Sequence, residues 1–122
     1  MEMKGETKTV WIMGGRYLHE EVSGPDFKGM SIAGYDNNSK KYVGTWVDSM
    51  TTSISHMTGE FDATGKTFTW HHTDYDPVFG QKIKMRDVIR ITGPDKHVME
   101  FYKTMPDGKE MKAGEIVSTR KK

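Results

Sequence analysis

The chain has 122 residues, the length of one ordinary domain, and contains no cysteine. Eighteen basic and seventeen acidic residues leave a formal net charge of +1, so no field of the whole chain favours nucleic acid or an anionic membrane. The absence of cysteine excludes disulfides and thiolate chemistry and fits a reducing compartment. No stretch approaches the roughly twenty apolar residues of a membrane span. We therefore expect a single cytoplasmic domain over residues 1–122.

Turn signals recur along the whole chain and predict an all-β fold. Between them lie short segments rich in Val, Ile, Thr and aromatic residues, and proline is confined to the turns. No segment carries apolar residues at helical spacing. The pattern predicts one antiparallel meander of about nine strands, at residues 5–13, 16–23, 27–35, 41–50, 52–61, 66–74, 81–92, 97–105 and 109–120.

The segment 81–92 has the clearest alternation of all the predicted strands. Apolar residues at 83, 85, 89 and 91 alternate with basic residues at 82, 84, 86 and 90, which predicts one dry and one wet face. Met85 and Asp87 both fall on the dry face. Because an unpaired buried carboxylate costs several kcal/mol, Asp87 is expected to be paired, protonated or exposed to a wet cavity.

The hairpin around residue 64 can be registered by asking which pairing makes one face apolar. A loop from Asp62 to Gly65, which pairs Phe61 with Lys66, collects aromatic side chains on one face. This register turns Trp70 and His72 inward, and the adjacent residue, His71, outward.

The hairpin around residue 37 repeats the same pattern, an aromatic residue and Asp followed by Lys and a second aromatic residue. The same register places Trp46 and Asp48 on its inner face. The opposite face is unusually apolar for a solvent surface, and we expect a second protomer or the chain's own end to cover it; it carries Met30, Ile32, Val43 and Val47.

Two blocks of sequence resemble a known family. The run from Gly14 to Leu18 and the block from Lys40 to Met50, with its Thr-Trp-Val-Asp-Ser core, resemble the bacterial family catalogued as domain of unknown function 1579. The closing part, from Pro106 onward, looks like the C-terminal segment of that family. The resemblance covers nearly the whole chain. It implies a calycin-like or lipocalin-like barrel that binds small ligands inside, and it implies no established activity and no catalytic residues.

From the resemblance we expect that the chain starts late and lacks an N-terminal segment that family members have before the strand that leads to Gly14. The expected fold is therefore a calycin-like or lipocalin-like barrel or a partly open barrel. An open sheet edge is usually covered, blunted or paired with another chain. We therefore expect a homodimer, formed through the apolar face or the unclosed edge.

Aromatic walls with a few convergent polar groups are typical of a small-molecule pocket. The final two strands allow two phases, one turning Met99 and Phe101 inward and the other turning Val98, Glu100 and Tyr102 inward. Glu115 is expected as a further inward acid. The predicted ligand-binding residues are Trp46, Asp48, Trp70, His72, Met85, Asp87, Tyr102 and Glu115.

Three functions fit these residues. The leading hypothesis is a non-catalytic protein that binds a hydrophobic or amphipathic small molecule. The alternatives are a structural or assembly protein whose polar groups satisfy one another, and a carboxylate-dependent or metal-dependent enzyme. No metal site is predicted, because His71 and His72 are adjacent in a strand and point to opposite faces. The sequence identifies no cofactor.

Overall fold

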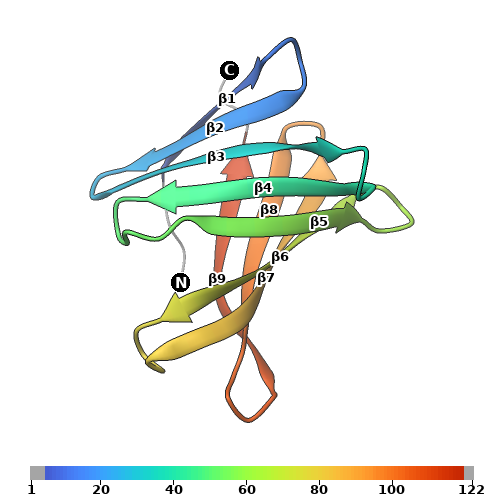
Figure 1. Cartoon of the computed structure of the whole chain (residues 1–122). Helices are drawn as coiled ribbons and strands as arrows, with labels where there is room; N and C mark the ends of the chain where they lie inside the picture. The colour runs from blue at the N-terminus through green and yellow to red at the C-terminus, as the bar shows by residue number, and fades with distance from the viewer. Residues whose placement is uncertain (1–4, 120–122) are drawn as a thin grey trace. The chain divides into compact units, whose positions relative to one another are not determined.

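The computed structural model describes residues 5–119, and every regular element in this range is a β-strand (Figure 1). The order of the strands in the sheet is their order in the chain. The all-β antiparallel meander of nine strands is confirmed, with each predicted end within three residues of the observed one, except that residue 120 lies outside the described residues. The strands are β1 (Glu6–Ile12), β2 (Tyr17–Gly24), β3 (Phe27–Asp36), β4 (Lys41–Asp48), β5 (Ser55–Phe61), β6 (Thr67–Asp76), β7 (Gln81–Gly93), β8 (Lys96–Thr104) and β9 (Glu110–Thr119).

Contacts between residues group the described chain into two compact units, divided within β5. The N-terminal unit comprises residues 5–58 and contains β1 to β4, and the C-terminal unit comprises residues 59–119 and contains β6 to β9. Within residues 5–119 no helix is long and apolar enough to cross a membrane. Of the predicted site residues, Trp46 and Asp48 belong to the N-terminal unit and the other six to the C-terminal unit.

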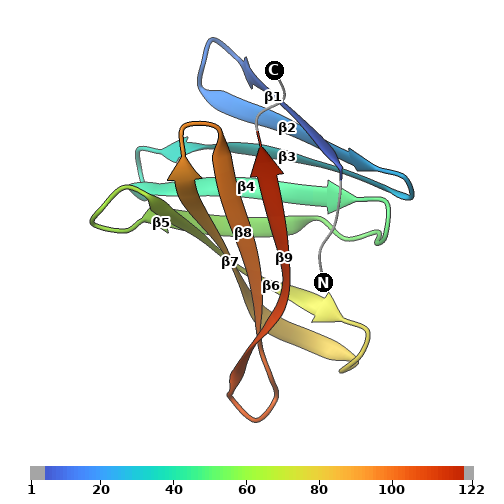
Figure 2. The ribbon, with the colours of Figure 1, turned by 180° about the vertical axis from the view of Figure 1, so that it is seen from behind.

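In the N-terminal unit, β1 to β4 lie side by side and pair in order (Figures 1 and 2). Both glycines of the Gly14–Gly15 pair in the β1–β2 turn have positive φ, at 71° and 85°. These are angles that glycine adopts without steric cost, which explains why two glycines stand at this turn.

The β3–β4 hairpin depends on an aspartate at its start. Asp36 pairs with Lys41, and its Oδ1 accepts a hydrogen bond of 3.0 Å from the backbone N–H of Asn38. The N–H of Lys40 donates to the carbonyl oxygen of Asp36 at 2.8 Å, which puts Lys40 in the left-handed region at a φ of 57°. An L-residue with a side chain is strained at this angle.

The β6–β7 hairpin repeats this turn with glycine at the strained position. The N–H of Gly80 donates to the carbonyl oxygen of Asp76 at 2.8 Å, and Gly80 has a φ of 64°. The carboxylate of Asp76 accepts a hydrogen bond of 2.8 Å from the N–H of Val78. Gly80 is thus the unstrained counterpart of Lys40.

Replacing Lys40 by glycine should therefore stabilise the protein. We expect Lys40→Gly to raise the free energy of unfolding by about 1 kcal/mol, because glycine removes the left-handed penalty. Lys41→Gly is the matched control, and it should destabilise the protein because Lys41 is in a regular strand. Urea denaturation of the two variants measures both values, and a loss of stability in Lys40→Gly would contradict the prediction.

The predicted loop of the β5–β6 hairpin is displaced by one residue. The backbone N–H of Asp62 donates to the carbonyl oxygen of Thr67 at 2.9 Å, so the hairpin closes at this pair and not at Phe61 and Lys66. The rings of Phe61 and Phe68 meet edge to face with centroids 4.9 Å apart. The partner of each residue in β5 therefore lies two residues further along β6 than predicted. The predicted faces are preserved, because side chains alternate with a period of two.

The pairing of β6, β7 and β8 sorts the side chains of the C-terminal unit onto two faces. Trp70, Asp87 and Phe101 are directly opposite one another and share one face, called here the Trp70 face. Met99 and Phe101 therefore take the first of the two predicted phases. By alternation the Trp70 face carries Phe68, Trp70, His72, Asp74, Asp76, Gln81, Ile83, Met85, Asp87, Ile89, Ile91, His97, Met99, Phe101 and Lys103.

A β-bulge in β9 explains why Glu115 was predicted on the wrong face. Tyr102 of β8 pairs with Lys112 of β9, and the preceding residue of β8, Phe101, pairs with Gly114. Ala113 lies between these two partners and pairs with no residue of β8. Beyond a bulge the alternation continues in the opposite phase. Glu115 consequently lies on the face opposite Trp70, called here the Arg86 face.

The indole of Trp46 limits the size of a residue in β3, Gly29, which is directly opposite Asp48. A Cβ atom built on Gly29 would lie 2.4 Å from Cη2 and Cζ2 of the Trp46 indole, well inside van der Waals contact. The indole also stacks on Phe27, with ring centroids 6.3 Å apart and an interplanar angle of 21°. Glycine at position 29 therefore provides the space in which Trp46 lies.

This contact predicts that even one added methyl group is destabilising. We expect Gly29→Ala to lower the free energy of unfolding by about 1–3 kcal/mol, the usual cost of overpacking. Gly93→Ala is the matched control, because a Cβ at Gly93 meets no atom within 4 Å. Thermal denaturation of both variants tests the difference, and equal melting temperatures would be evidence against the packing role of Gly29.

Candidate functional site

The candidate site is built on two neighbouring strands of the C-terminal unit. β6 carries Trp70, His72 and Asp74 at alternate positions, so all three side chains share the Trp70 face. In β7, Asp87 is directly opposite Trp70 and Met85 directly opposite His72. The register therefore brings four of the eight predicted site residues together.

The imidazole of His72 lies between two carboxylates. Its Nδ1 contacts Oδ2 of Asp74, and its Nε2 is 3.0 Å from Oδ2 of Asp87. The side chain of His72 is only 11% exposed, against 25% for Asp74 and 17% for Asp87. The expectation that Asp87 is paired is confirmed.

Two opposing effects act on the protonation of His72. Burial of the ring lowers its pKa, but the hydrogen bonds and negative charges of Asp87 and Asp74 outweigh burial and raise the pKa above its ordinary value. A neutral imidazole has one N–H, whereas an imidazolium has two. Only the protonated ring can donate to both carboxylates at once, so the arrangement favours the charged form.

Asp87 retains a hydrogen-bonding position that is not used within the chain. Its Oδ2 faces His72, and within residues 5–119 its Oδ1 has no hydrogen-bond partner. The indole of Trp70 is on the same face directly across the strand pair. The site thus presents an unused carboxylate oxygen beside an aromatic ring.

A buried ion pair further along the same face was not predicted. Asp76 is 1% exposed, and its Oδ2 accepts a hydrogen bond of 2.6 Å from Nζ of Lys103 in β8. The hydrogen bond from Lys103 lowers the pKa of Asp76 more than burial raises it. The sequence does contain a signal for its acidic member. Alternation along β6 from His72 places Asp74 and Asp76 on the same face.

The Arg86 face carries a separate network of ion pairs. Arg90 donates to Glu100 at 2.6 Å, and Nζ of Lys112 is 3.0 Å from the same carboxylate. Hydrogen bonds from Arg90 and Lys112 lower the pKa of Glu100 to about 2. These pairs are surface interactions that bind the strands to one another.

Both predicted residues on β8 and β9 belong to this network and lie on the face opposite Asp87. The hydroxyl of Tyr102 donates to Glu100 at 3.2 Å, and its ring lies under the guanidinium of Arg86, 4.2 Å from the ring centroid. Glu115 accepts a hydrogen bond of 3.1 Å from Lys112. Neither residue shares a face with Asp87.

Trp46 and Asp48 of the N-terminal unit satisfy each other. The indole N–H of Trp46 donates to Oδ2 of Asp48 at 2.7 Å, and the backbone N–H of Met50 donates to Oδ1 at 2.8 Å. They share one face of β4, as predicted. Both oxygens of Asp48 are therefore occupied, and its contacts are those of a structural residue.

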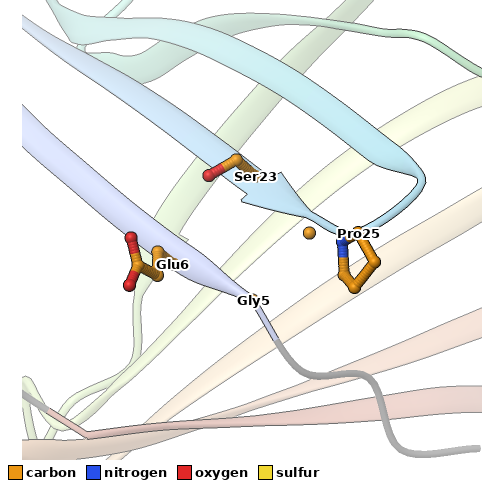
Figure 3. A pocket seen from close by; sticks show the side chains of 5 residues that line it. Gly5, Glu6, Ser23 and Pro25 are labelled. Atoms are coloured by element: carbon orange, nitrogen blue, oxygen red, sulfur yellow. The ribbon is translucent and has the colours of Figure 1, made fainter.

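Away from this site, a hollow that is open to solvent lies at the end of β1 and β2. It is lined by Gly5, Glu6, Ser23, Gly24 and Pro25, with Glu6 on one strand and Ser23 on the other (Figure 3). None of the predicted site residues lines it. In the described part of the chain, no group of three His, Cys, Asp or Glu side chains is arranged to hold a metal ion.

The position of His72 predicts that stability falls as the pH rises. The raised pKa of the folded state exceeds the roughly 6.5 of an unfolded histidine. The stabilisation from His72 is therefore complete below about pH 6.5 and is lost as the pH rises through the folded-state pKa. We expect the difference in free energy of unfolding between the wild type and His72→Gln to shrink over this range, measured by urea denaturation.

His71→Gln provides the control for this experiment. The ring of His71 also meets a carboxylate, Glu60 at 2.7 Å, but its side chain is 49% exposed and points to the other face. His71→Gln should keep the pH dependence of the wild type. Parallel stability curves for the wild type and His72→Gln would show that the cluster does not bind its proton more tightly when folded.

Comparison with known proteins gives one match. No curated protein matches the chain. The family described as protein of unknown function (DUF1579) matches residues 1–120, which is nearly the whole chain and includes every strand and the whole His72 cluster. The chain therefore belongs to the DUF1579 family.

Proposed function

We propose that this protein binds a small amphipathic molecule on the Trp70 face of its C-terminal unit, without catalysis. The observation that carries the proposal is the unused Oδ1 of Asp87 beside Trp70. An apolar wall supplies affinity, and a fixed polar group supplies orientation, as in most small-molecule sites. The cysteine-free composition supports a cytoplasmic location.

The charges of this face favour a ligand that carries a cation or a hydrogen-bond donor. Around Trp70, three carboxylates, of Asp74, Asp76 and Asp87, lie on the same face as His72 and Lys103. Lys103 already neutralises Asp76. Trp70 and Phe101 provide the apolar area beside these charges. The proposed ligand therefore has a cationic head and an apolar tail.

A second candidate function is structural. The contacts of His72 with both neighbouring carboxylates, and of Trp46 with Asp48, are those of polar groups that stabilise a fold. Among the described residues, no buried side-chain nitrogen or oxygen lacks a hydrogen-bond partner. On this reading the cluster joins β6 to β7 and binds nothing.

Two probes with equal apolar tails test the proposal, octylammonium and octanoate. Isothermal titration calorimetry should detect octylammonium and not octanoate. Asp87→Asn should weaken the binding of octylammonium by about tenfold to a hundredfold, because a hydrogen bond to a charged group is lost. Glu60→Gln, on the opposite face, is the control and should bind like the wild type.

Native mass spectrometry of the protein as purified complements the titration. A small molecule that is present in the wild type and lost in Trp70→Ala would support the proposal and identify the ligand. Equal affinities for octylammonium in the wild type and Asp87→Asn would contradict the assigned site. Failure of both probes to bind, together with a ligand-free mass, would favour the structural function.

A further inference from the structure

One face of the N-terminal unit carries apolar side chains on all four strands and exposes those of β1, β2 and β3. β1 to β4 pair without interruption, so residues directly opposite one another share a face. Four residues of this face are each 42% exposed, one on β1, one on β2 and two on β3. We call it the apolar face, and it comprises Val10, Tyr17, Met30, Ile32, Val43 and Val47.

The charges around the apolar face cancel. Lys8 is opposite Glu21, and Asp36 is opposite Lys41. Lys8 and Glu21 lie in one row with Met30, and Asp36 and Lys41 close the β3–β4 hairpin. Acidic and basic side chains are thus mixed, and the face has no net charge that would select nucleic acid or an anionic membrane. A surface of this kind fits a partner with the same balanced pattern, and a second copy of the chain has one.

The residues of β3 on this face would complement the same residues of a second copy of the chain. In chain order they are Lys28, Met30, Ile32, Gly34 and Asp36, with a cation at one end, an anion at the other and Ile32 in the middle. A two-fold axis through Ile32, perpendicular to the strand, places Lys28 on Asp36 of the second copy. Such an isologous contact is the commonest way in which proteins dimerise.

The same axis matches large residues with small ones. Met30 would face Gly34 of the second copy. Within each chain the ring of Tyr17 lies over Gly34, because a Cβ atom built on Gly34 would be 2.8 Å from that ring. Thioether sulfur packs well on aromatic rings. In the free chain the sulfur of Met30 is 3.1 Å from Nε2 of His19, so it is already held on this face.

From this charge complementarity we propose that the protein is a homodimer in which two apolar faces pack against each other about a two-fold axis through Ile32. Four strands about 4.8 Å apart and about seven residues long form a face of roughly 20 by 25 Å. This area is near the lower limit of specific interfaces. The dimer should therefore dissociate in the micromolar range.

Sedimentation velocity over about 1 to 200 μM spans this affinity. The wild type should pass from monomer to dimer. Ile32→Glu should weaken association by at least about a hundredfold, because the two introduced carboxylates meet across the axis. Ile54→Glu, at an isoleucine that is 63% exposed and outside the apolar face, is the control and should dimerise like the wild type.

Mixing two variants tests the axis itself. Ile32→Glu and Ile32→Lys should each be monomeric, and an equimolar mixture should dimerise, because opposite charges then meet. Lys28→Glu, which disturbs the strand less, should weaken the dimer by opposing Asp36 of the second copy.

Far-ultraviolet circular dichroism confirms that each variant is folded. A wild type that stays monomeric over the whole range would overturn the proposal, as would a dimer that Ile32→Glu leaves intact. Failure of the mixed variants to associate would overturn the two-fold axis.

Discussion

The faces of this protein depend on one repeated contact, the hydrogen bond between an aspartate carboxylate and the backbone N–H two residues further along a hairpin turn. It occurs between β3 and β4, β5 and β6, β6 and β7, and β8 and β9, at Asp36, Asp62, Asp76 and Asp107. Each contact fixes where a hairpin closes and therefore which residues pair. Since a slip of one residue would exchange the two faces of a strand, these turns decide that His72 and Asp87 meet at all.

Alternation then gives the two faces of the C-terminal unit different chemistry. On the Trp70 face, the pairing of His72 with both carboxylates depends on a proton that is lost as the pH rises through the raised pKa of the imidazole. On the Arg86 face, Arg86 forms two hydrogen bonds with Glu110, of 2.6 and 2.7 Å, and both groups keep their charge over a wide pH range. Exposed pairs of this kind are worth at most about 1 kcal/mol each. Val88 also lies on the Arg86 face and is 2% exposed.

Sequence reasoning was most successful where a period of two is uninterrupted. The nine strands, the inward Trp70 and His72, and the outward His71 all follow from alternation between recognisable turns. Sequence reasoning placed Glu115 of β9 on the wrong face, because nothing in the amino-acid pattern indicates that Ala113 is unpaired. It missed Asp74, which alternation from His72 places on the same face, and it could not find Lys103, the partner of Asp76, because the two residues are on different strands. The role of Asp87 beyond its pairing is still a proposal.

The bulge at Ala113 gives β9 one position at which its length can change without cost to the ladder. Residues after the bulge keep their faces only because one residue is left out of the ladder, which brings Lys112 and Glu115 onto the same side. Deleting Ala113 would remove the bulge and leave Gly114, Glu115 and Ile116 with their present partners and faces. Deleting a paired residue of β9 would instead exchange the faces of the residues on one side of the deletion. Among relatives of this chain, insertions and deletions should therefore accumulate in the loop after Met105 and, within β9, at the bulge.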